Sequence, residues 1–188
     1  RGIVIPHHIT VSGTNTLTLS GVVPGYISSQ NRHISIPTNR YSTVTLNRGL
    51  KLNLPNWVNY YVRGNSTLFI DAQVMGAGPL GPGVYSGTPY VIFRNNGNSF
   101  IGGIQGDAGS PLFTSIADKN VPSATGANGD IGQNNGPVTY IGSRTQSSNR
   151  TFAPAQNFVL CNDSACGGLN LFGPVAAQSW ANVVLTLQ

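Results

Sequence analysis

Short runs in which apolar and polar residues alternate recur along the chain and predict β-strands. The most apolar run, residues 68–74, is expected to be a strand buried on at least one face. The Gly- and Pro-rich residues 76–83 cannot continue this strand, and residues 85–93 are again rich in β-formers. We therefore expect two core strands joined by a rigid surface loop.

The same alternation predicts strands on either side of this unit. Residues 2–19 and residues 41–54 each contain two alternating runs around a turn and predict hairpins. With residues 138–141, 158–161 and 183–187, the total reaches about nine to eleven strands. Residues 95–137 are dominated by Gly, Asn, Ser and Pro, and an irregular segment of this length is often a binding surface.

Composition restricts the fold to the all-β class. Only 8% of the 188 residues are charged and Glu is absent, whereas exposed helix faces are usually filled by Glu, Lys, Ala and Leu. Hydrophobic residues make up 39% of the chain, which is enough to form a core. We expect a single all-β domain, residues 1–188, with long polar loops.

Charge and cysteine content favour an extracellular protein. The net charge is +5, but the basic residues are scattered and form no basic run, so nucleic acid is not an expected partner. Cys161 and Cys166 lack further zinc ligands and predict a local disulfide, with two free thiols in a reducing compartment as the alternative. No apolar run reaches membrane length, so no membrane association is expected.

The strand predicted over residues 57–63 has two chemically different faces. Its core face would carry Val58, Tyr60 and Val62. The opposite face combines aromatic rings, an amide and a guanidinium, which suit sugars or acidic peptides. We predict a ligand-binding surface made of Trp57, Asn59, Tyr61 and Arg63, with Arg94 from the following strand. In the structural alternative, Trp57 and Tyr61 pack beneath a loop and Arg63 is solvated.

Residues 106–113, Gly-Asp-Ala-Gly-Ser-Pro-Leu-Phe, resemble the nucleophile loop of chymotrypsin-like serine proteases. In that family the loop presents the serine, and its backbone amides form the oxyanion hole. Ala108 stands at the nucleophile position, and His33 and Asp71 follow the family's His, Asp, Ser order. The resemblance implies at most an inactivated protease, because alanine has no nucleophilic atom.

The histidines do not form a metal set. His7 and His8 are adjacent and would point to opposite faces of a strand, and Asp is too sparse near them or His33 to complete a site. We therefore expect no metal and no cofactor. Sequons at Asn65, Asn149 and Asn162 would mark exposed loops if the chain were secreted by a eukaryote or archaeon.

Residues 74–87, Val-Met-Gly-Ala-Gly-Pro-Leu-Gly-Pro-Gly-Val-Tyr-Ser-Gly, resemble a segment in receptor-binding domains of chaperone-usher pilus tip adhesins, particularly the type 3 fimbrial kind. Residues 180–188 are similar to the last strand of such domains. The resemblance implies an elongated immunoglobulin-like or jelly-roll β-sandwich at the pilus tip, on the cell surface. It also implies a host glycan or extracellular protein as ligand and, in a longer adhesin, a pilin domain or pilus subunits as partners.

The residues themselves also favour binding over catalysis. Without Glu, and with isolated Asp residues, the chain offers no carboxylate pair and few groups for acid–base chemistry. We expect a non-catalytic adhesin domain. The alternative is a structural subunit of an extracellular filament or capsid, in which a terminal strand within residues 2–11 or 183–187 pairs with a neighbouring subunit.

Overall fold

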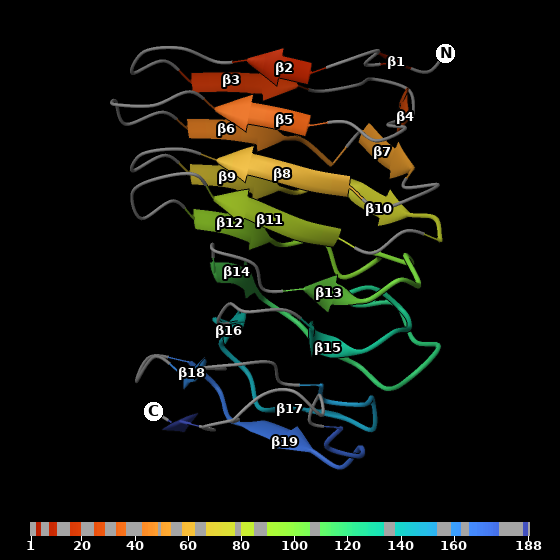
Figure 1. Cartoon of the computed structure of the whole chain (residues 1–188), viewed down its shortest axis with the longest axis vertical. Helices are drawn as coiled ribbons and strands as arrows, with labels where there is room; N and C mark the ends of the chain where they lie inside the picture. The colour runs from red at the N-terminus through yellow and green to blue at the C-terminus, as the bar shows by residue number, and fades with distance from the viewer. Residues whose placement is uncertain are drawn as a thin grey trace.

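The chain folds into a solenoid of stacked parallel β-strands (Figure 1). The computed structural model describes residues 3–4, 8–10, 16–19, 25–28, 33–36, 43–48, 50–53, 58–62, 67–77, 80–84, 90–105, 110–133, 138–153, 159–162, 166–176 and 186–187. These residues form strands and turns but no helix. The all-β prediction is therefore confirmed.

The strands follow the chain through the faces of the solenoid in turn, and all their pairings are parallel. The eight-stranded sheet consists of β3 (Thr16–Leu19), β6 (Thr43–Leu46), β9 (Thr67–Ile70), β12 (Tyr90–Phe93), β14 (Ser110–Phe113), β16 (Val138–Tyr140), β18 (Val159–Asn162) and β20 (Thr186–Leu187). The six-stranded sheet consists of β2 (His8–Thr10), β5 (His33–Ile36), β8 (Val58–Val62), β11 (Leu80–Val84), β13 (Ile104–Gln105) and β15 (Ile131–Gln133).

The third face of the solenoid consists of strands in some coils and of turns in others. Its first part is a four-stranded sheet of β1 (Ile3–Val4), β4 (Gly25–Ser28), β7 (Leu50–Asn53) and β10 (Gln73–Met75). After β10, turns take the place of strands in the next two coils. A two-stranded sheet of β17 (Gln146–Ser148) and β19 (Leu169–Leu171) then follows (Figure 1).

The core consists of side chains at equivalent strand positions, which are stacked from one coil to the next. Leu46, Ile70, Phe93, Phe113 and Tyr140 are successive register partners, 24, 23, 20 and 27 residues apart, and each is fully buried. The rings of the last two lie 5.5 Å apart between centroids. Each buried side chain of this size stabilises the fold by about 1.5–3 kcal/mol. This row fixes the register of the eight-stranded sheet.

The expected immunoglobulin-like or jelly-roll sandwich is not confirmed. The hairpins expected in residues 2–19 and 41–54 are absent from the described residues, because the strands of each segment belong to different sheets. The described residues form twenty strands, which are shorter than expected because each coil is divided by corners. Alternation determines which side chains of a strand are buried, but it does not determine which other strand pairs with it. The partners here lie one coil apart in the sequence.

The Gly- and Pro-rich block after residue 75 is partly strand, which corrects the loop prediction. Gly76 leaves β10 with φ 111°, a left-handed conformation that glycine adopts readily. The following strand β11 contains Pro82, in register with Tyr60 of β8. On its other side β11 pairs with β13 only at Leu80. A proline without an N–H is tolerated where one side of a strand is not hydrogen-bonded, and among the described residues β11 has few pairings on this side.

The segment expected to be irregular, residues 95–137, contains β13, β14 and β15 and is held by buried polar side chains. Asn98 is fully buried, and its Oδ1 accepts a hydrogen bond of 2.8 Å from the Val74 N–H. Its Nδ2 donates a bond of 3.2 Å to the Ala124 carbonyl. Asn98 therefore ties together the backbones of three successive coils, which an apolar side chain could not do.

The protease-like segment is part of the solenoid. Its second half forms β14, which pairs in parallel with β12 and β16. Ala108 lies outside the described residues. Chymotrypsin-like proteases are built from β-barrels, so this parallel setting differs from that of their nucleophile loop.

Candidate functional site

The residues predicted as a binding surface are divided between two faces of the solenoid. Asn59 and Tyr61 belong to β8 in the six-stranded sheet, whereas Arg94 directly follows β12 in the eight-stranded sheet. Trp57 and Arg63 lie outside the described residues. The binding role of the β8 residues stays a prediction, and Arg94 belongs to a different surface feature.

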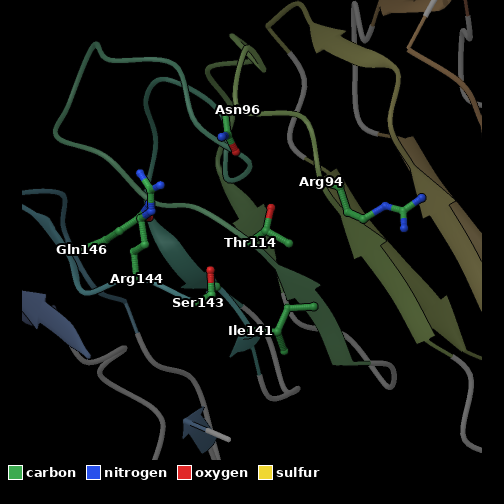
Figure 2. A pocket seen from close by; sticks show the side chains of 8 residues that line it. Arg94, Asn96, Thr114, Ile141, Ser143, Arg144 and Gln146 are labelled. Atoms are coloured by element: carbon green, nitrogen blue, oxygen red, sulfur yellow. The ribbon is translucent and has the colours of Figure 1, made fainter. Parts of the chain in front are cut away.

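That feature is a groove of about 510 Å³ along one edge of the eight-stranded sheet (Figure 2). It is lined by Arg94, Asn96, Thr114, Ile141, Gly142, Ser143, Arg144 and Gln146. These residues come from three successive coils, where the chain leaves β12, β14 and β16. Hydroxyl, amide and guanidinium groups dominate the lining.

The parallel register brings the lining residues together. Phe93, Phe113 and Tyr140 are stacked, so the residues that follow them, Arg94, Thr114 and Ile141, form a row. The ladder continues through this row: the Thr114 N–H donates to the Phe93 carbonyl at 3.1 Å, and the Ile141 N–H donates to the Phe113 carbonyl at 2.9 Å. Because the carboxyl ends of parallel strands meet at the same edge, distant residues become neighbours.

One side of the groove is formed by Arg94, whose charge is already compensated. Its Nε and Nη2 donate to the two carboxylate oxygens of Asp71 at 2.6 and 2.7 Å. The guanidinium also lies over the Phe69 ring, 4.1 Å from its centroid. Figure 2 shows the Arg94 side chain extending away from the other lining residues. Arg94 therefore shapes the groove without offering it a free charge.

The opposite side is a turn, residues 141–144, that is held rigidly against the core. The buried Tyr140 hydroxyl donates to the Arg144 carbonyl. Burial is the main cause that raises the pKa of Tyr140, and an electrostatic interaction with Cys166 adds to it. Gly142 is buried, and a Cβ there would collide with the Tyr140 hydroxyl and the Thr114 carbonyl. Only glycine allows the turn to pack this closely.

Only part of this site could be predicted from the sequence. Asn96 and Thr114 lie in the Gly- and Asn-rich segment expected to be a binding surface, but Ser143, Arg144 and Gln146 lie outside it. No contiguous motif joins them, because they are separated by whole coils. The spacing of Phe93, Phe113 and Tyr140, each just before a lining residue, is the signal that could have revealed the row.

The predicted disulfide between Cys161 and Cys166 is not found, and Cys166 is a free cysteine. Cys161 lies in β18 at the register position of Thr139. Cys166 instead interacts with Tyr140, the next residue along β16.

In the described part of the chain, no three residues of the types His, Cys, Asp and Glu gather as a metal set would. This part also contains no helix with the length and apolar character of a membrane span. No family model, curated protein or solved structure matches this chain. The function must therefore be inferred from the groove itself.

Proposed function

We propose that this chain is a non-catalytic, ligand-binding domain of an extracellular adhesin and that it binds a glycan in the groove beside the eight-stranded sheet. The observation that supports this is the lining: hydroxyl, amide and guanidinium groups from three coils surround a groove of about 510 Å³. Sugars are recognised by directional hydrogen bonds from such groups in concave sites. The rigid turn at residues 141–144 keeps these groups in place before the ligand arrives.

The proposal is tested by filling the groove. Ser143 is exposed and lines the groove, so Ser143→Trp should place a bulky ring in it without disturbing the core. Asn170, which is exposed in β19 and outside the groove lining, provides the matched control Asn170→Trp. On an array of host glycans and matrix proteins, the first variant should lose the ligand and the second should retain it, with equal melting temperatures. Equal binding by both variants would contradict the groove as the binding site.

The narrower expectation of a pilus tip adhesin stays a proposal. The segment that carries the resemblance, residues 74–87, contains the end of β10 and all of β11. The support for an adhesin comes from the groove and from the low charge of the chain. A host glycan is the preferred ligand, and an extracellular matrix or plasma protein is the other ligand class to be tested.

A structural subunit of an extracellular filament is the second candidate, and one observation favours it. In the last coils Phe172 and Val175 are 76% and 67% exposed, next to β19. Exposed apolar groups at a sheet edge favour pairing with another subunit. Light scattering separates the candidates, because the adhesin domain should be a monomer of about 20 kDa whereas a filament subunit should form polymers as its concentration rises.

A further inference from the structure

The amide and guanidinium groups of the groove offer mainly hydrogen-bond donors. Gln146 has its Oε1 occupied, because it accepts the Ile116 N–H at 2.7 Å. Asn96 has its Oδ1 occupied by the Ser115 hydroxyl at 2.6 Å. Ser115 Oγ itself accepts the Ala124 N–H at 2.8 Å, so its proton is directed at Asn96 and fixes the orientation of that amide. Both amides therefore keep their NH₂ groups for a ligand.

Arg144 adds an uncompensated positive charge. Its side chain is exposed and forms no ion pair within the described part of the chain. Its backbone is fixed by the hydrogen bond from the Tyr140 hydroxyl and by close packing against Gly167, where a Cβ would collide with the Arg144 carbonyl group. The nearby Arg94 is paired with Asp71, so Arg144 supplies the excess charge of the groove.

This donor-rich arrangement selects among glycans. A neutral sugar offers hydroxyls that need acceptors as well as donors, and each amide oxygen of the groove already accepts one hydrogen bond, which leaves the hydroxyl oxygens of Thr114 and Ser143 as the main acceptors. A carboxylate or sulfate only accepts hydrogen bonds, and the planar guanidinium fork matches its oxygens. We infer that the groove recognises an acidic glycan through an oxyanion, carboxylate or sulfate, bound by Arg144 with the amide NH₂ groups of Gln146 and Asn96.

The size of the groove limits how much of the ligand is bound. Parallel strands lie about 4.8 Å apart, so the three coils that line the groove span about 10 Å. This length accommodates roughly two sugar units, with one acidic group near Arg144. This inference rests on the proposed glycan-binding function and narrows it to one ligand class.

The test compares three probes on the purified chain by isothermal titration calorimetry. The probes are a tetrasaccharide of glucuronic acid, the same tetrasaccharide with its carboxyl groups reduced to alcohols, and a sulfated tetrasaccharide. We expect at least one acidic probe to bind at least about tenfold more tightly than the reduced probe, because a charge-assisted hydrogen bond is lost. Preference between the acidic probes distinguishes a carboxylate from a sulfate.

Arg144→Gln should weaken binding of the preferred acidic probe at least about tenfold and leave the melting temperature unchanged. The matched control is Arg48→Gln, since Arg48 is exposed and outside the groove lining. Binding should also weaken as salt rises from about 0.05 to 0.5 M.

The outcomes separate the two proposals. Equal binding of acidic and neutral probes would overturn the acidic-ligand inference and leave the glycan-binding function standing. Unchanged acidic binding in Arg144→Gln would overturn the role of Arg144. If no glycan or protein on the array binds, the proposed function itself fails.

Discussion

Replacing Arg150 by alanine should release the turn at residues 125–129, which this buried side chain holds. Arg150 is 2% exposed and donates to the carbonyls of Thr125, Gly126, Asn128 and Gly129 at 3.1, 3.4, 2.8 and 3.1 Å. It also donates to the Thr125 hydroxyl at 2.8 Å. Burial lowers the pKa of Arg150 to about 10, which still leaves the guanidinium charged at neutral pH. The Arg150 side chain therefore donates hydrogen bonds to most of the backbone carbonyls of this turn.

The expected magnitude follows from four contributions. The Thr125 carbonyl belongs to a buried residue and loses its donor, which costs roughly 1–3 kcal/mol, whereas the Gly126 carbonyl still accepts the Ser123 hydroxyl at 2.8 Å. The hydrogen bonds lost at the Asn128 and Gly129 carbonyls cost about 1 kcal/mol each. Loss of two buried methylenes of the Arg150 stem costs about 1.6 kcal/mol. Removing the buried charge recovers roughly 3 kcal/mol of folding free energy, because burial lowers the pKa of Arg150 from 12.5 to about 10. The net loss is about 2 kcal/mol, or about 30-fold in the opening equilibrium of the turn.

Amide hydrogen exchange measures this opening directly. The N–H groups of Asn120 and Ala127 are bonded to carbonyls at 2.6 and 3.0 Å, so they exchange only when the turn opens. Their exchange should accelerate about 30-fold in Arg150→Ala, whereas the Thr114 N–H in the sheet ladder should change little. The control Arg144→Ala removes an exposed arginine and should leave all three amides unaffected. Unchanged exchange of Asn120 and Ala127 in Arg150→Ala would refute the reasoning.

Two further predictions concern the groove turn. Gly142→Ala should lower the unfolding free energy by about 1–3 kcal/mol and abolish glycan binding, because the new Cβ meets Tyr140 and Thr114; a chemical denaturation curve matching the original protein would contradict this. Tyr140 holds its proton more tightly in the folded state than in the unfolded state, where it titrates near pH 10. Its contribution to stability is therefore complete below pH 10 and is lost as pH rises through its raised folded pKa. Tyr140→Phe should flatten this alkaline decline in denaturation curves recorded from pH 8 to 12, and an unchanged slope would exclude the tyrosine as its source.

The sequence by itself determined the class of structure and much of its core. Alternation in residues 67–70 and 90–93 matches the buried positions of Leu68, Ile70, Val91 and Phe93, since strand geometry sends successive side chains to opposite faces. The low charge and the absence of Glu argued against helices, because few residues of the chain have the propensity to fill exposed helix faces. These properties depend on neighbours in the chain, which the sequence displays directly.

Only the tertiary structure decided which strands pair and which side chains share a site. An alternating run such as residues 43–46 fits an antiparallel hairpin or a parallel coil equally well, and the choice rests on contacts 20 to 27 residues away. The same stacking brings Asn96, Thr114 and Arg144 into one groove and places Arg150 beneath residues 125–129. Local patterns cannot reveal such sites, because their hydrogen bonds join segments that meet only when the coils stack.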